Sequence, residues 1–330
     1  MENDLFLESF SRLLADVADM VEVRAVHGGA STSAMWQALT ESGFLDALVA
    51  ETHGGVGLGR AEILPLFMLA GRRLLPVAFA HTVVARMLIA TAGEALPVDG
   101  PILLWPVGSS GTLRSQIPPA AFEAGHALVQ HGASFRIVPL RAGDGGDGFG
   151  FHAATLVADA SPLVEFEIKD CDLLDWAAAL TAVSSAGAAA RVLELSQQHV
   201  TERQQFGRAL GNFQAIQHLI AQAAEQSVLA ATAARIGFSG KDVALDPLRV
   251  ALAKTLTANA ASELSRIAHA VHGAIGISKE HDLQLYTRLL KRWQLSYGSQ
   301  DFWAERIGAA RIAASDGTAV DFIRTALAPS

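Results

Sequence analysis

A short segment near residue 203 carries side chains suited to holding a phosphate. It reads Thr201-Glu202-Arg203-Gln204-Gln205-Phe206-Gly207-Arg208 and continues through Gly211 to His218. Gly207 allows the backbone to turn between two helices, because glycine adopts a positive φ without steric cost. Arg203 offers a planar, permanently charged guanidinium that matches the geometry of a phosphate. The segment therefore predicts a contact to an anionic group, and a pyrophosphate is the ligand it fits best.

An isolated pair of such residues has a simpler explanation. Arg203 would pair with Glu202 or cap the C-terminus of its helix, and Phe206 would belong to the core. The length of the whole segment favours the functional interpretation over this one, because the match to a known pattern extends far beyond the two residues.

The segment from Thr201 to His218 resembles the signature of the acyl-CoA dehydrogenase family. In that signature an Arg-x-x-Phe-Gly turn is followed by a Gln that starts the next long helix. In the family, this arginine and the nearby Gln and Phe contact the FAD of the neighbouring subunit in a dimer. The resemblance therefore implies that Arg203, Gln205, Phe206 and Gln214 bind FAD.

A second segment, Ala270 to Glu280, resembles the family's Gln-x-His-Gly-Gly-x-Gly segment, and the Arg-Leu-Leu-Lys run that follows it resembles Arg-Asp-x-Arg. Gly273 and Gly276 would let backbone N–H groups approach a cofactor closely, although an ordinary helix-to-helix turn also uses glycines. Ala270 replaces the family's Gln and Leu289 its Asp. The resemblance thus implies cofactor binding at Gly273 and Gly276 with fewer dinucleotide contacts than usual.

A third and weaker match lies near the N-terminus. Residues 36–44 and 51–58 resemble the family's N-terminal helix and its Pro-Glu-x-x-Gly-Gly-x-Gly turn. With the first two matches, this covers both ends of the chain in the family's order.

The family's catalytic base is missing from its usual places. The reaction removes the α-proton of an acyl-CoA with a carboxylate and passes the β-hydrogen to the flavin as hydride. Tyr297 stands at the usual glutamate position, and a phenol with a pKa of about 10 is a poor base at neutral pH. At the family's alternative position, counted back from Arg203, stand Ala177 and Ala178. Asp175 is the nearest carboxylate, which we interpret first as a linker or capping residue and second as a candidate base.

Three regions differ in their residue patterns. Apolar residues recur at helical spacing from Glu2 to about Gly93, short β-type runs follow, and long helical stretches return from Ala177. The glycines of residues 141–148 predict a flexible turn within the β region. The resemblance implies a mainly α fold with an N-terminal helical domain (1–96), a reduced middle β domain (97–172) and a C-terminal four-helix bundle (173–330).

The middle region also departs from the family, whose members place a Trp-x-Thr or Trp-x-Ser segment against the flavin ring. Neither residues 105–107 (Trp-Pro-Val) nor residues 175–177 (Asp-Trp-Ala) are a convincing substitute. The features that are lost act within one subunit, whereas the retained arginine segment acts across a subunit boundary.

Composition excludes several classes of function. Of the 330 residues, 51% are hydrophobic and 18% charged, with a net charge of -8, so no large positive field exists to hold nucleic acid or an anionic membrane. The lone Cys171 excludes an intramolecular disulfide, and no clustered Cys/His spacing suggests a metal site. No targeting segment or membrane-spanning stretch is apparent, so we expect a cytoplasmic protein.

These observations lead to one main hypothesis and three alternatives. The main hypothesis is an FAD-dependent acyl-CoA dehydrogenase subunit that needs a second, glutamate-bearing chain, similar to the short chains of α2β2 enzymes for bulky sterol-derived acyl-CoA thioesters. The expected partners are an acyl-CoA substrate, that second chain and an electron-transfer flavoprotein. The alternatives are a complete enzyme with an unrecognised base, a catalytically inactive helical scaffold of the same fold, and a flavin-dependent monooxygenase.

Overall fold

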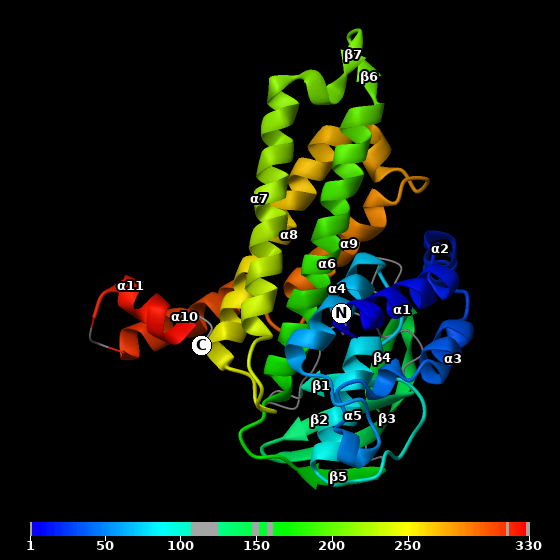
Figure 1. Ribbon diagram of the computed structural model, residues 1–330, viewed down its shortest axis with the longest axis vertical. Coiled ribbons are helices and arrows are strands. Elements are labelled where there is room, and N and C mark those ends of the chain that lie inside the picture. The colour runs from blue at the N-terminus through cyan, green and yellow to red at the C-terminus, as the bar shows by residue number, and fades with distance from the viewer. Residues whose placement is uncertain (1, 107–124, 147–151, 157–160, 315–316, 328–330) are drawn as a thin grey trace.

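The computed structural model describes residues 2–106, 125–146, 152–156, 161–314 and 317–327 (Figure 1). The N-terminal part is helical. Its elements are α1 (Glu2–Val17), α2 (Met20–His27), α3 (Ser33–Glu41), the short turns η1 (Phe44–Asp46) and η2 (Glu51–His53), α4 (Arg60–Arg72) and α5 (Phe79–Thr91). Asp19 begins α2 by accepting hydrogen bonds from the amides of Val21 and Glu22, which satisfies donors that the helix itself leaves free.

A small sheet follows these helices. Its strands are β1 (Ile102–Pro106), β2 (His126–His131), β3 (Ser134–Gly146), β4 (His152–Leu156) and β5 (Val164–Glu167). They lie in the order β1-β2-β3-β4, with β5 also paired to β3, and only the β1–β2 pair is parallel. One face of the sheet carries a separate small core that includes Leu103, Trp105 and Val129.

The turn predicted for residues 141–148 is wrong over its first part. Residues 141–146 continue β3 and pair with β4, with an irregular register between Ala142 and Gly146. Hydrogen bonds from a neighbouring strand outweigh the low strand preference of glycine, and a bulge takes up the mismatch. Asp147 and Gly148 lie outside the described residues.

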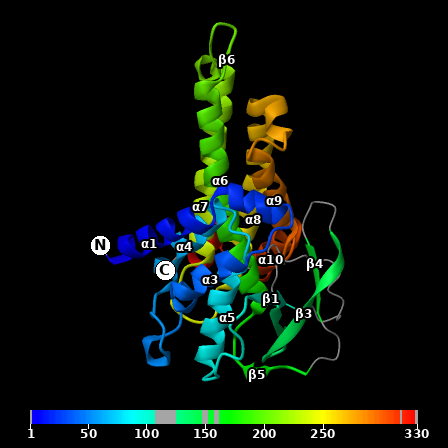
Figure 2. The same ribbon diagram turned by 90° about the vertical axis from the view of Figure 1, so that its right-hand side faces the viewer.

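The C-terminal part is a bundle of long helices. Its elements are α6 (Leu173–Glu202), the hairpin strands β6 (Gln204–Gln205) and β7 (Arg208–Ala209), the turn η3 (Leu210–Asn212), α7 (Gln214–Gly237), α8 (Pro247–His272), the turn η4 (Gly273–Ile277), α9 (Leu283–Leu295), α10 (Gln300–Ala313), α11 (Ala319–Phe322) and the final turn η5 (Ile323–Leu327). In both views the β6–β7 hairpin projects beyond the rest of the molecule at the end of α6 and α7 (Figures 1 and 2). The predicted fold class is confirmed, while the exact domain bounds stay a prediction.

Helix α6 is the central element of the molecule. Asp172 begins it by accepting a hydrogen bond from the amide of Leu174, and most of its alanine-rich length is buried. The helix is long and apolar enough to cross a membrane, so the expectation that no stretch of the sequence has this length and composition is wrong. However, 83% of its most apolar window is buried inside the protein, as expected for the core helix of a bundle.

Two glycines bring α4 and α6 into direct backbone contact. A Cβ atom added at Gly187 would overlap the carbonyl oxygen of Met68, and one added at Gly71 would overlap the backbone of Ser184. Helices approach this closely only where side chains are absent at the crossing point. The two glycines therefore fix the N-terminal helices against the bundle.

We expect Gly187→Ala to destabilise the chain. The added methyl group has no space at the α4–α6 crossing, and such overpacking costs about 1–3 kcal/mol. Gly308→Ala is the matched control, because Gly308 lies within α10 with open space around its Cα, where alanine is the better helix former by up to about 1 kcal/mol. Urea unfolding of the two variants measures both effects, and equal midpoints would contradict the crossing geometry.

Candidate functional site

The tip of the β6–β7 hairpin is strained and exposed. Gln204 pairs with Ala209 and Gln205 with Arg208, which leaves Phe206 and Gly207 as the turn, at φ values of 55° and 81°. Positive φ at both central positions is the geometry of a tight hairpin turn, and a bulky residue such as phenylalanine adopts it at a cost of about 1–3 kcal/mol. The Phe206 side chain is nevertheless 90% exposed. A strained and exposed aromatic residue at the tip of a projection is expected where another molecule covers it.

The charged and polar side chains around this tip are also available to bind a ligand. Arg203 ends α6, is exposed, and forms no ion pair with any described residue. Glu202, its sequence neighbour, accepts a hydrogen bond from Gln198 instead. Arg203 therefore does not pair with Glu202 and Phe206 does not lie in the core. Arg203 does cap the C-terminus of α6, where its backbone N–H donates to the carbonyl oxygen of His199 at 2.9 Å, and this leaves its guanidinium available. We define the exposed set Arg203, Gln205, Phe206 and Gln214 as the hairpin site.

Arg208 differs from Arg203 although both flank the same turn. Its guanidinium carbon lies 4.0 Å from the centre of the Phe213 ring, so this cation is already placed against an aromatic face. Phe213 in turn contacts Phe206 edge to face, with ring centres 6.1 Å apart. Arg203 is therefore the cation of this hairpin that remains free to meet an anionic ligand.

The second predicted segment lies at the same end of the bundle. His199, in the last turn of α6, stacks on His272 at the end of α8 with ring centres 4.4 Å apart. Gly273 follows at a φ of 61°, exposed and with open space around its Cα. Gly276 is buried and packs against His272 and Leu283. Gly273 thus suits a close backbone contact with a ligand, whereas Gly276 serves the packing of the turn.

Both candidate bases lie at the opposite end of the molecule. Asp175 is in the first turn of α6 and Arg203 just after the last, which at 1.5 Å per residue separates them by about 42 Å. Tyr297 joins α9 to α10 at that same lower end, where its carbonyl oxygen accepts a hydrogen bond of 2.9 Å from Trp303. One cofactor therefore cannot contact the hairpin site and either base position of the same chain.

Tyr297 has the surroundings of a structural residue. It is fully buried, and its hydroxyl donates a hydrogen bond of 3.1 Å to the carbonyl oxygen of Leu104 in β1. Burial raises the pKa of this phenol above its ordinary value. With Gly298 it forms a turn in which both residues have positive φ. The residue at the family's glutamate position thus ties the sheet to the bundle through its hydrogen bond to Leu104.

Asp175 is better suited to accept a proton, but it has no defined substrate. Asp172 caps α6, so the capping role suggested for Asp175 is wrong. Asp175 is buried beside Arg306, at 3.4 Å, in an open groove of about 720 Å³. Burial, followed by the charge of Asp172, raises its pKa to about 7. A carboxyl poised near neutrality is a chemical possibility for a base, and that assignment stays a prediction.

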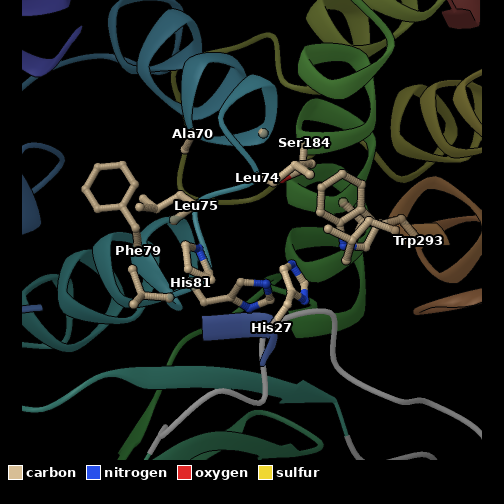
Figure 3. Close-up of a pocket in the computed structure, with 14 residues that line it drawn as sticks. His27, Ala70, Leu74, Leu75, Phe79, His81, Ser184 and Trp293 are labelled. Carbon is tan, nitrogen blue, oxygen red and sulfur yellow. The ribbon is translucent and has the colours of Figure 1, made fainter. Parts of the chain in front are cut away.

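A small cavity lies near Tyr297. Figure 3 shows His27, His81 and Trp293 around it, contributed by α2, α5 and α9. Burial lowers the pKa of both histidines to about 4, so they are neutral, and the His81 ring lies 6.0 Å from that of Tyr297. Its volume of about 50 Å³ accommodates water molecules but not an acyl thioester, because sites for such ligands measure about 300–1,000 Å³. No sequence signal links these three residues, which lie far apart along the chain.

The tryptophans of the two segments 105–107 and 175–177 both have structural surroundings. Trp105 is buried in the small core of the sheet, and the indole N–H of Trp176 donates to the carbonyl oxygen of Val243 at 3.1 Å. Neither ring is presented to a ligand, in agreement with the expectation that these segments do not replace the family's flavin-facing tryptophan. Val107 lies outside the described residues.

The burial of the phenols gives a spectroscopic prediction. The chain has two tyrosines, and burial raises the pKa of Tyr286 to about 12 and that of Tyr297 as well. At pH 10.5 we expect almost no tyrosinate absorbance from the folded protein, whereas after unfolding about three quarters of the two phenols should be ionised, as for a pKa of about 10. Ultraviolet titration of the chain and of Tyr297→Phe tests this. A phenol that ionises near neutral pH and disappears in Tyr297→Phe would instead identify an activated tyrosine.

Asp175 gives a prediction for the pH dependence of stability. Its folded pKa of about 7 lies above the ordinary value of 3.8, so between these pH values the folded chain binds a proton that the unfolded chain has lost. Stability therefore falls as pH rises through this window, by up to about 1.4 kcal/mol per pH unit. In Asp175→Asn this contribution should be absent. Unfolding free energies at pH 5 and pH 7.5 test it, and an unchanged difference between them would contradict the raised pKa.

Known proteins share the sequence and the architecture described above. Residues 171–312 match the family described as acyl-CoA dehydrogenase, C-terminal domain. Among curated proteins, the chain is 29% identical over 292 residues to acyl-CoA dehydrogenase FadE34 of Mycobacterium tuberculosis, an alignment covering 81% of this chain and 40% of that protein. It is 25% identical over 296 residues to acyl-CoA dehydrogenase IpdE2 of Mycolicibacterium smegmatis, covering 86% of this chain and 91% of IpdE2. The chain thus spans less than half of FadE34 and most of IpdE2.

Solved structures agree with this assignment. A variant of the Tcur3481-Tcur3483 steroid ACAD superposes with a TM-score of 0.80 at 22% identity, covering 96% of this chain and 99% of the matched one. A chain of the ChsE4-ChsE5 complex from Mycobacterium tuberculosis superposes with a TM-score of 0.76 at 18% identity, with the same coverage. At these identities the likeness establishes the fold alone. Together with the sequence matches, it supports the resemblance: residues 171–312 match the C-terminal domain of acyl-CoA dehydrogenases, and the described residues have the fold of those proteins.

Proposed function

We propose that this chain is one subunit of a heteromeric, FAD-dependent acyl-CoA dehydrogenase, and that its hairpin site contacts an FAD shared with a second chain. The observation that carries the proposal is the exposed, strained Phe206 beside the free cation Arg203, about 42 Å along α6 from Asp175. Because the hairpin site projects from the molecule and has no candidate base near it, it is suited to completing a binding site on another molecule.

The residues of the hairpin site fit the edge of a dinucleotide. The Arg203 guanidinium matches a pyrophosphate, the exposed amides of Gln205 and Gln214 offer hydrogen bonds, and Phe206 offers an aromatic face. Gly273 adds a backbone segment that no side chain shields. When bound, FAD supplies the hydride acceptor for α,β-dehydrogenation. The role of this chain is to hold and orient that cofactor and to cover it from water.

The substrate and the base belong to the second chain in this proposal. The cavity beside Tyr297 holds only about 50 Å³, and Tyr297 itself is a buried hydrogen-bond donor. A glutamate-bearing acyl-CoA dehydrogenase chain would provide the carboxylate that removes the α-proton. The names of the steroid ACAD and the ChsE4-ChsE5 complex support a two-chain assembly and a bulky, sterol-derived acyl-CoA thioester. An electron-transfer flavoprotein is the expected electron acceptor, and the cytoplasm the expected location.

Expression alone and with a partner separates this proposal from its alternatives. Alone, the chain should retain little FAD and show no acyl-CoA oxidation. With a glutamate-bearing chain from the same genomic neighbourhood it should form a mixed oligomer that is yellow and active. Full turnover by the chain alone would contradict the proposal, and a mixed oligomer without flavin would favour the inactive scaffold.

A pair of arginine variants tests the hairpin site itself. In the mixed oligomer, Arg203→Ala should weaken FAD retention at least tenfold, since loss of a charge-assisted hydrogen bond costs about 1.5–3 kcal/mol. Arg208→Ala removes the same charge from the same hairpin, but its guanidinium stacks on Phe213, so the loss should be smaller. Flavin released on dilution, followed by fluorescence, measures both. Equal FAD retention in Arg203→Ala and the unmodified oligomer would contradict the assignment.

A further inference from the structure

A second concave site lies on the side of the bundle, away from the hairpin site. Residues of α1, α2, α4, α6 and α9, with Arg73 just after α4, line an open groove of about 710 Å³. This volume falls within the range of about 300–1,000 Å³ that small-molecule sites occupy. From Arg191 in the groove to Arg203 is about 18 Å along α6, so a small ligand cannot contact both. The groove is therefore independent of the proposed flavin contact.

The walls of the groove are largely apolar and only partly covered by protein. They include the half-buried side chains of Leu7, Met20, Met68 and Leu69. The backbone of Gly187 forms part of the floor, because α4 and α6 meet there without side chains between them. Partly exposed methionine and leucine side chains in a concavity adapt well to an apolar ligand.

The rim of the groove carries a surplus of positive charge. Arg72 and Arg191 both form ion pairs with the same carboxylate, that of Glu194. Arg73 also lines the groove and forms no ion pair with any described residue. Three guanidinium groups line the groove, and the one carboxylate paired with two of them leaves a local charge of +2 in a chain whose net charge is -8. An anion is therefore favoured here, against the overall charge of the protein.

The position of these charges is fixed by neighbouring contacts. The buried Tyr286 hydroxyl donates a hydrogen bond of 2.8 Å to the carbonyl oxygen of Arg72, where α4 ends. This contact holds the end of α4, and with it Arg72 and Arg73, against α9. The backbone that carries Arg72 and Arg73 is thus placed before any ligand arrives, which reduces the entropy lost on binding.

We propose that this groove binds a small amphipathic anion, a molecule with an apolar body and a single carboxylate or phosphate group. The apolar body lies against Leu7, Met68 and Leu69, and the anionic group meets Arg73 and Arg191. The site does not depend on flavin or on a second chain.

Calorimetric titration of the full-length chain tests the site. Octanoate and octyl phosphate carry the expected chemistry, octanol lacks the charge, and inorganic phosphate lacks the apolar body. We expect saturable binding of the two amphipathic anions, at least tenfold tighter than that of octanol or inorganic phosphate. If octanoate binds and octyl phosphate does not, or the reverse, the head group is identified. Absence of saturable binding by both anions, or equal binding of octanol, would overturn the proposal.

Variants locate the binding within the groove. Arg73→Gln combined with Arg191→Gln should weaken octanoate binding at least tenfold, whereas Arg266→Gln, an exposed arginine on α8 that does not line the groove, should leave it unchanged. Ala190→Phe keeps every charge and fills the groove, and should also abolish binding. Circular dichroism confirms that each variant is folded. Binding that survives both groove variants would show that the anion binds elsewhere and refute the assignment.

Discussion

The structure depends on α6, a buried helix of 30 residues that connects two ends with different chemistry. Its middle is fixed against α4 by the backbone contact at Gly71 and Gly187, its first turn lies beside the sheet and α10, and its last turn carries the hairpin away from the molecule. A rigid helix of this length keeps its ends about 42 Å apart. The free Arg203 and the base positions can therefore act together only if they belong to different chains.

The β6–β7 hairpin combines backbone strain with exposure, as expected of a site that is shared with another molecule. Phe206 adopts the positive φ that the tight β6–β7 turn requires, which is unfavourable for a large side chain. It exposes 90% of its surface and contacts only the Phe213 ring, edge to face, among the described aromatic residues. Such local strain persists where it serves a function. At the other end, Tyr297 shows the reverse pattern: it is buried and hydrogen bonded to Leu104, and burial raises the pKa of its phenol.

Local patterns in the sequence predicted much of this architecture. Helical spacing and the β-type runs predicted the order of helical, β and helical regions, and the resemblance carried by the segment around Arg203 predicted the fold class. Other features result from contacts between distant residues and have no local signal. Pairing with β4 makes a glycine-rich segment part of a strand. Gly276 packs within its turn, whereas Gly273 has open space around it. The residue that caps α6 is Asp172 and not Asp175. The groove lined by Arg72, Arg73 and Arg191 could not be predicted from the sequence either, because these arginines form a cluster only after the helices have packed.

The central claim is that one FAD is shared between this chain and another. The most direct measurement is the flavin content of the purified two-chain oligomer, obtained from the absorbance of released FAD and the amount of each polypeptide. The account predicts one FAD for every pair of chains. One FAD for every chain would mean that this chain completes a flavin site of its own, and would contradict the account.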